Sequence, residues 1–339
     1  MIIITAANAE IKQTMGHQCP CFFYIAKKGG MNIEMKYVYG PVPSRRLGLS
    51  LGISPIPKKA CNYSCVYCQL GRTDKMTNTR QLFFPVEEII REFDAFLNKN
   101  FSFDVVTIVG EGEPTLYLGL GKLISEIKHR TEKPVAVITN GALLYDRDMR
   151  EELKEADIVL PTLDAYDEDT FKKINRPHGS ISYKSVIQGL KDFSREYEGE
   201  LWVEIMLIQG MNDDDASLEK LKKILKEISY DRIYINTPVR PPAESDVKAI
   251  DNERMKSAVE ILNGISIELL ESEGFYSDTE DDLEAVISII KRHPMNQHEI
   301  EGFLESRKCS DIRGIIDNLR DDLRIKVINY KGYDTFRLK

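Results

Sequence analysis

Short runs of β-branched and aliphatic residues alternate with amphipathic helical patterns between about residues 49 and 270. The runs predict strands within residues 49–56, 104–110, 134–140, 157–164, 201–210 and 231–238. Helices are expected at 85–97, 185–197 and 217–228, where apolar residues recur at intervals of three and four. Several of the strand runs are apolar almost throughout, which is typical of strands that are buried on both faces.

This alternation predicts an α/β fold with a parallel sheet and right-handed crossovers. A complete eight-fold barrel would have two more units, so we expect a partial (β/α)6 TIM-like barrel over residues 35–270. A doubly wound sheet is the alternative. In both architectures, ligands bind at the carboxyl ends of the strands. Residues that carry chemistry are therefore expected directly after each strand.

A second, smaller domain is expected at residues 281–339, after an acidic linker at 271–280. Helical patterns at 283–293, 296–304 and 311–323 precede a hairpin that turns at Lys331 and Gly332, an order that resembles a winged helix. DNA binding is not expected, because the third helix carries acids that would repel phosphates. We expect a module that contacts protein or presents substrate, with RNA as an alternative ligand of the basic hairpin residues Lys326, Lys331 and Arg337.

Residues 1–34 form an N-terminal extension outside the pattern, and translation is expected to begin at Met31 or Met35. If the extension is translated, its Cys19 and Cys21 are candidates, with the distant Cys309, for holding an auxiliary cluster.

The composition limits the classes of protein to which the chain can belong. With 339 residues, of which 42% are hydrophobic and 29% charged, the chain can bury a large core. It has neither an apolar run of about 20 residues nor a secretory signal, so we expect a cytoplasmic protein without a membrane span. The net charge of −8 gives no general basic field for gripping nucleic acid.

Three of the six cysteines, Cys61, Cys65 and Cys68, lie within eight residues after the first predicted strand. In a reducing compartment such a group indicates a metal or redox site rather than a disulfide framework. A structural zinc site needs four ligands, and no fourth cysteine or histidine is near in sequence. Three thiolates can instead hold three irons of a four-iron cluster and leave the fourth iron open. Pro55 and Pro57 before the cysteines and Gly71 after them favour a loop. A helix with three buried thiols on one face is the structural alternative.

The motif "CNYSCVYC" resembles the CxxxCxxC signature of the radical S-adenosylmethionine (SAM) superfamily. Further blocks, "GPVPSRRLGLSLGISPIPKKA", "GEGEPTL", "ITNGALL", "LPTLDAYDEDTFKKINRPH", "VEIMLIQGMND" and "INTPVRPPAE", extend the resemblance over roughly residues 37–245. They are similar to an iron–sulfur oxidoreductase subgroup related to the wyosine-type tRNA-modifying enzymes.

The resemblance implies a [4Fe-4S] cluster and SAM as cofactors, and reductive cleavage of SAM to a 5′-deoxyadenosyl radical that abstracts hydrogen from an unidentified substrate. It also implies an external one-electron reductant of the flavodoxin or ferredoxin type. A wyosine-type tRNA base-modifying enzyme is one alternative. An iron–sulfur regulator that uses the winged helix is another.

The same resemblance implies metal ligands at the three cysteines and places cofactor-binding residues at the strand ends. "GEGEPTL" carries Glu111 where many relatives outside the subgroup have glycine. Ordinary turns, packing or structural ion pairs are the alternatives at these positions, and no residue is assigned to hydrogen abstraction itself. The expected cofactor-binding residues are Tyr67, Gly112, Glu113, Pro114, Thr139, Asn140, Asp164 and Glu204.

Positively charged side chains, here called the cationic rim, are expected around the opening of the site at the carboxyl ends of the strands. They would suit an anionic substrate or the carboxylate of SAM. Lys58 and Lys59 directly precede the cluster motif, and a Schiff-base role for them is conceivable. The rim candidates are Arg45, Arg46, Arg72, Arg176, His178 and Arg240.

Overall fold

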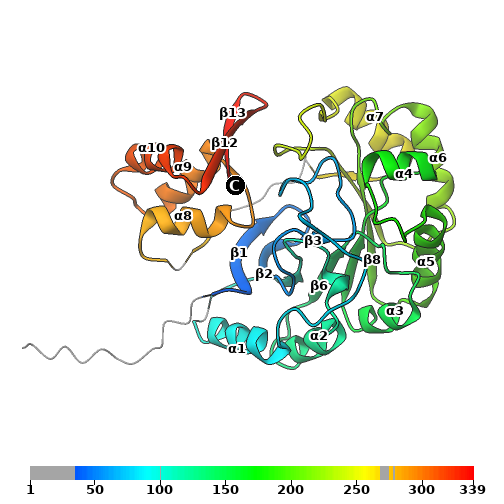
Figure 1. Ribbon diagram of the computed structural model, residues 1–339, viewed down its shortest axis with the longest axis horizontal. Coiled ribbons are helices and arrows are strands. Elements are labelled where there is room, and N and C mark those ends of the chain that lie inside the picture. Colours follow the sequence, from blue (N-terminus) through cyan, green and yellow to red (C-terminus); the bar gives the residue numbers. More distant parts are fainter. Residues whose placement is uncertain (1–34, 100, 268–274, 278) are drawn as a thin grey trace, which may run out of the picture. The chain divides into compact units, whose positions relative to one another are not determined.

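The computed structural model describes residues 35–99, 101–267, 275–277 and 279–339, and Met35–Lys339 form one compact unit (Figure 1). The predictions for Cys19, Cys21 and the rest of the N-terminal extension lie outside the described residues, as does much of the predicted linker. Within the described part, no helix is long and apolar enough to cross a membrane.

A central sheet of eight strands has the order β1-β2-β5-β6-β7-β8-β9-β10. All neighbouring pairs are parallel except the antiparallel pair of β1 and β2. Each of the six predicted strands is present, so the α/β class with a mostly parallel sheet is confirmed. The strands are β1 (Val38–Ser44), β2 (Gly48–Ile53), β5 (Val105–Ile108), β6 (Val135–Thr139), β7 (Ile158–Pro161), β8 (Glu200–Met206), β9 (Arg232–Asn236) and β10 (Ile265–Ser266).

The periodicity predicted neither of the two edge strands, β1 and the two-residue β10, and β1 has the more unusual sequence. Its sequence "VYGPVPS" contains Gly40, Pro41 and Pro43, which normally interrupt strands. An edge strand tolerates proline because one side of its backbone needs no ladder partner. Here the register against β2 shifts between Tyr39 and Val42, where the prolines begin.

Seven helices and one 3-10 turn connect the strands of the main sheet (Figure 1). Five of these helices begin directly at an Asp or Ser whose side chain accepts a backbone N–H of the first turn, which satisfies a donor that would otherwise be unpaired. The connections are α1 (Val86–Leu97), η1 (Pro114–Leu116), α2 (Leu120–Lys128), α3 (Arg147–Leu153), α4 (Glu168–Ile174), α5 (Tyr183–Glu196), α6 (Asp215–Leu225) and α7 (Asn252–Leu262).

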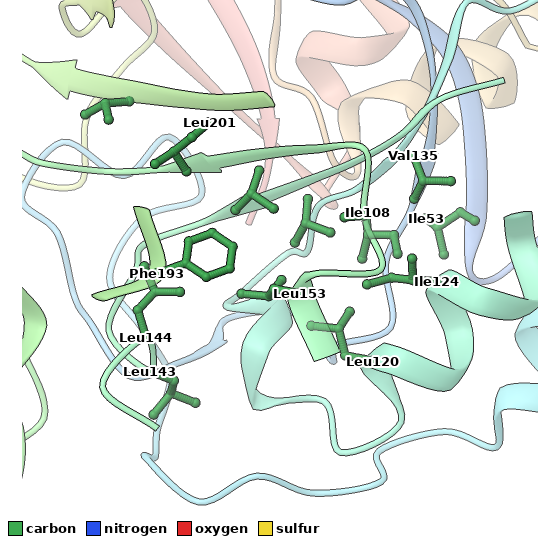
Figure 2. Close-up of a cluster of buried hydrophobic side chains, with 14 of the residues drawn as sticks. Ile53, Ile108, Leu120, Ile124, Val135, Leu143, Leu144, Leu153, Phe193 and Leu201 are labelled. Atoms are coloured by element: carbon green, nitrogen blue, oxygen red, sulfur yellow. The ribbon is translucent and has the colours of Figure 1, made fainter. Parts of the chain in front are cut away.

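Alternate side chains of each strand point to opposite faces of the sheet, and the two faces have different contents. On one face, strand residues such as Ile108 and Val135 share a large core with helix residues such as Leu120 and Ile124 (Figure 2). On the second face, a smaller apolar cluster contains Val105, Ala136, Ile158, Leu160, Trp202 and Tyr234.

The second face changes character along the strands. Two residues beyond the apolar cluster, the same face presents mostly polar side chains, which line a cavity. The cavity therefore lies at the carboxyl ends of the strands, where the α/β pattern predicts ligands. The lining residues of this face include Ser50, Thr107, Ile138, Thr162, Glu204 and Asn236.

Residues 279–339, here called the C-terminal module, have a hydrophobic core of their own, in which Ile290, Phe303 and Phe336 are buried. The three predicted helices and the hairpin turning at Lys331 and Gly332 are confirmed, and a short strand joins the hairpin in a sheet of order β11-β13-β12. The elements are α8 (Asp282–Ile290), β11 (Met295–Asn296), α9 (Gln297–Ser306), α10 (Ile312–Asp321), β12 (Ile325–Tyr330) and β13 (Tyr333–Leu338).

The start of β1 is held by a buried carboxylate. Glu92 on α1 is 3% exposed and accepts the backbone N–H groups of Lys36, Tyr37 and Val38, the last at 2.7 Å. Replacing Glu92 with Ala leaves several buried donors unpaired, at about 1–3 kcal/mol each. We expect Glu92→Ala to lower the free energy of unfolding, measured in urea, by about 3 kcal/mol.

Glu87→Ala on the same helix is the control, because Glu87 only pairs with Lys122 on the surface. The control should leave the unfolding curve nearly unchanged. Equal effects of the two substitutions would contradict the capping role of Glu92.

Candidate active site

A cavity of about 790 Å³ lies at the carboxyl ends of the strands, and Cys61, Cys65 and Cys68 all line it. Cys61 ends a two-residue strand, β3 (Ala60–Cys61), which pairs with β4 (Lys75–Met76). The chain from Cys65 to Gly71 forms consecutive turns, in which Cys68 N–H donates to Cys65 O at 3.1 Å. The thiols therefore lie on a loop, as predicted, and the helical alternative is wrong.

The three thiols are half-buried and near enough to influence one another electrostatically. Burial, followed by the negative charge of Glu113, raises the pKa of the Cys61 thiol to about 12. Burial also raises the pKa of Cys65 and of Cys68. Without added positive charge these groups stay protonated, so a cationic partner is needed to make them thiolate ligands.

Several N–H groups face the sulfurs. The backbone N–H of Tyr63 donates to Cys61 Sγ at 3.4 Å, and Asn140 Nδ2 lies 3.8 Å from the same sulfur. Asn175 Nδ2 lies 3.7 Å from Cys65 Sγ. Hydrogen bonds to cysteine sulfurs are a general feature of iron–sulfur sites, where they tune the reduction potential.

Within the described residues, no three Cys, His, Asp or Glu side chains are arranged as ligands of a single metal ion. A four-iron cluster does not require such an arrangement, since each cysteine binds a different iron. Three half-buried, mutually close thiols with N–H donors around them fit that group.

Gly112 fixes the position of the cysteine loop. A Cβ atom at Gly112 would lie 1.8 Å from the carbonyl oxygen of Ala60, the residue before Cys61. The next residue, Glu113, donates its backbone N–H to the same oxygen at 3.1 Å, and Lys59 N–H donates to Glu111 O. The glycine is thus required by a backbone contact within the protein.

Glu113 joins the ends of β5 and β6. Its carboxylate is 2% exposed and accepts Thr115 Oγ1 and Thr139 Oγ1, both at 2.6 Å, and the N–H of Asn140 at 2.8 Å. Burial raises its pKa, and these hydrogen bonds oppose the increase. Pro114 begins the following 3-10 turn. None of these residues lines the cavity. They therefore stabilise the strand ends around the cavity and do not face it.

Asp164 anchors the aromatic ring beside the cysteines. Tyr67 OH donates to its carboxylate in a short hydrogen bond, and Asn175 Nδ2 and Met206 N each donate at 2.8 Å. Burial raises the pKa of Asp164 to about 6, although the three donors oppose this increase. Tyr67 lines the cavity, whereas Asp164 lies behind it.

Glu204 on β8 does line the cavity, and it forms an ion pair with Arg46. Asn236 Nδ2 on the neighbouring strand donates to Glu204 Oε1 at 3.0 Å. Among the predicted cofactor-binding residues, Tyr67, Gly112 and Glu204 therefore face the cavity directly.

The predicted cationic rim is only partly correct. Arg45, Arg46 and Arg240 line the cavity. Arg72 and Arg176 instead bind Glu244 outside it, and the ring of His178 pairs with Ser180. Lys59, which we had placed only before the cluster, also lines the cavity and lies 3.5 Å from Asp74.

The C-terminal module also contributes to the cavity wall, which no pattern in the sequence predicted. Two ion pairs of opposite polarity join the module to the strand ends. Arg292 lies 3.6 Å from Glu111, and Arg240 lies 3.0 Å from Glu299. Cys309 lies elsewhere, half-buried at the edge of the module's own core. The module residues that line the cavity are Arg292, His293, His298, Glu299, Gly302 and Phe303.

Glu244 tethers the cysteine loop from outside. Its backbone N–H donates to Val66 O at 3.1 Å, and its carboxylate receives two hydrogen bonds from Arg72 and one from Arg176. The Arg72 hydrogen bonds, above all, lower the pKa of Glu244 to about 2. Glu244 therefore stays ionised in the folded protein at pH values well below the usual carboxyl pKa.

We expect Glu244→Gln to lower the unfolding temperature at neutral pH by a few degrees. Because the folded-state pKa is depressed, the wild-type advantage is complete above the ordinary carboxyl pKa near 4.3 and disappears as the pH falls toward 2. Thermal unfolding of both proteins between pH 7 and pH 3 measures this. The exposed Glu253→Gln is the control and should match wild type. A Glu244→Gln deficit that does not shrink on acidification would contradict the tether.

Gly112→Ala should displace the loop that carries Cys61, since the new methyl group overlaps the Ala60 carbonyl. We expect a loss of at least about 3 kcal/mol in the free energy of unfolding, at or above the usual range for overpacking. Gly179→Ala is the matched control, because nothing lies within 4 Å of a Cβ placed there. An unchanged urea midpoint for Gly112→Ala would rule out the close approach.

Comparison with known proteins gives the family. The model of the Radical SAM superfamily matches residues 56–221. The UPF0026 protein MJ1312 of Methanocaldococcus jannaschii is 35% identical over 309 residues, which cover 88% of this chain and 94% of that protein. The GTPase Obg of Brachyspira hyodysenteriae is 43% identical over 226 residues, but the chain spans only 33% of its length.

Among solved structures, Streptococcus suis SuiB bound to precursor peptide SuiA aligns with a TM-score of 0.50 at 18% identity. The alignment covers 65% of this chain and 49% of that one, and at this identity it shows the fold alone. The near-complete match to the M. jannaschii protein and the family match over the cysteine loop agree with each other. The chain therefore belongs to the UPF0026 proteins of the radical SAM superfamily and is a radical SAM enzyme.

Proposed function

We propose that Cys61, Cys65 and Cys68 hold a [4Fe-4S] cluster and that SAM binds beside it in the large cavity. The observation that carries this proposal is that one loop brings all three thiols to a single cavity at the strand ends. When bound, the cluster supplies the electron that cleaves SAM to methionine and a deoxyadenosyl radical, which removes a hydrogen atom from the substrate. The electron comes from a reductant of the flavodoxin or ferredoxin type, and a reducing cytoplasm keeps the thiols free.

In this proposal the protein residues position the cofactors. Gly112 and Glu113 hold the cysteine loop on the end of β5, and Thr139 and Asn140 extend the same network to β6. Tyr67 presents its ring to the cavity while Asp164 fixes its hydroxyl.

Charged groups on the wall have a separate role. Glu204 offers acceptor oxygens for ribose hydroxyls, with Arg46 compensating its charge. The apolar cluster beneath the cavity, which includes Leu160 and Trp202, closes it from the other end and excludes water.

We further propose that the C-terminal module is winged-helix-like and contacts substrate. Its residues line the cavity, which favours this role. Its third helix, α10, has the acids Asp317 and Asp321 beside Arg320, and Arg320 is engaged with Asp317 and Asp334. This helix is poorly suited to DNA phosphates. The comparisons lend no support to an iron–sulfur regulator, and wyosine-type tRNA modification stays a prediction.

Anaerobic reconstitution with iron and sulfide, followed by dithionite and SAM, tests the proposed function. Wild type should bind about four irons per chain and release deoxyadenosine. Cys65→Ala should lose most of the iron and all detectable cleavage. Cys309→Ala, which removes a half-buried free thiol outside the cavity, is the control and should retain both. Unchanged iron content in Cys65→Ala would place the metal site elsewhere.

A further inference from the structure

A smaller cavity of about 280 Å³ adjoins the large one. Arg45, Val239 and Arg240 line both cavities, so the two are neighbours that share one wall. The opposite wall of the smaller cavity belongs to the C-terminal module. It is formed by Asn296 before α9, Thr335 and the hairpin residues Tyr330, Lys331 and Tyr333.

The shared wall has an excess of positive charge. Arg45 has no hydrogen-bond or ion-pair partner among the described residues, whereas Arg240 binds Glu299 with two hydrogen bonds of 3.0 Å. None of the described residues that line the smaller cavity is acidic. Lys331 adds a third cationic side chain to the lining.

The nearby His293 is affected by the same positive charges. His293 lies within hydrogen-bonding distance of Arg240, and burial followed by the positive charges of Arg240 and Arg45 holds its pKa well below the usual range. His293 is therefore neutral, and it adds neither a further cation nor a counter-charge. Of the two guanidinium groups at this junction, that of Arg240 is paired with Glu299 and that of Arg45 has no carboxylate partner among the described residues, which leaves the junction favourable for an anion.

The size and the donors of the smaller cavity indicate which anion. Two arginines, a lysine, the hydroxyls of Tyr333 and Thr335 and an asparagine side chain line it, whereas Tyr330 OH already donates to Pro238 O at 2.7 Å. A phosphate group has more acceptor oxygens than a carboxylate and can use more of these donors. A water molecule occupies about 30 Å³ of liquid, so the cavity has room for a phosphate group and a few waters.

We propose that the smaller cavity binds a phosphate group of the substrate, which holds the adjoining part of the substrate in the large cavity beside the cysteine loop. This inference rests on the proposed function and names a substrate class for it, a phosphate ester. Arg45 and Lys331 bind the phosphate from the two walls, and Arg240, whose terminal N–H groups are engaged by Pro294 O, His293 and Glu299, contributes its positive charge.

Titration calorimetry of inorganic phosphate into the reconstituted full-length protein, at constant ionic strength, tests the site. Wild type should bind phosphate, and Arg45→Gln and Lys331→Gln should each weaken binding at least about tenfold, as expected for loss of a charge-assisted hydrogen bond. Arg195→Gln makes the same charge change on the exposed face of α5 and should match wild type. Acetate, the carboxylate probe, should bind more weakly than phosphate.

Phosphate binding that is absent, or equally strong in wild type and in Arg45→Gln, would overturn the inference. So would acetate binding as tight as phosphate. Deoxyadenosine release, measured on the same preparations without substrate, separates the two proposals. Cleavage of SAM without phosphate binding leaves the proposed function standing and removes this site. Phosphate binding that depends on Arg45, without cleavage of SAM, supports the site and contradicts the proposed function.

Discussion

The contact between the carbonyl oxygen of Ala60 and the backbone at Gly112 is the constraint on which the site depends. It leaves no space for a side chain at Gly112, and it is reinforced by hydrogen bonds from Glu113 N–H to Ala60 O and from Lys59 N–H to Glu111 O. A mobile loop of three cysteines would have to be ordered by its metal. Here the residue before Cys61 is already bound to the segment that follows a central strand. Part of the entropy cost of ordering the cysteine loop is therefore incurred when the protein folds, before any metal binds.

The position of the cavity follows from the alternation of side chains along parallel strands. On the second face of the sheet, the first residues are large and apolar, as at Trp202 and Tyr234, and they pack against one another. Two residues later, the same face presents Glu204 and Asn236, which leave space and bind each other. In the register of β8 and β9, Glu204 is level with Tyr234 and Met206 with Asn236, so the change is staggered by two residues between these strands. The polar ends of the strands nevertheless line one cavity.

The sequence correctly predicted the features that depend on local sequence patterns. Strand runs, the proline-bounded cysteine loop and the hairpin at Lys331 and Gly332 depend on residues close together in the chain, and all are present. The edge strand β1 was not predicted, because prolines in its sequence are more typical of a loop. Glu204 is paired with Arg46, in agreement with the cost of an unpaired carboxylate in an apolar strand.

Other parts depend on contacts that no local signal encodes. Whether Glu113 or Asp164 faces the ligand or supports the wall is decided by which strand neighbours donate to it, and that follows from the register between strands. The pairs of Arg292 with Glu111 and of Arg240 with Glu299 join segments far apart in sequence. Arg72 and Arg176 were misplaced for the same reason, since Glu244 draws both away from the cavity.

The central claim is that this loop holds a four-iron cluster with one iron open to SAM. Mössbauer spectroscopy of the protein reconstituted anaerobically with ⁵⁷Fe tests it most directly. The account predicts a [4Fe-4S] spectrum in which addition of SAM changes the parameters of one iron in four and leaves the other three essentially unchanged. A mononuclear iron signal, or a cluster whose four irons all ignore SAM, would contradict it.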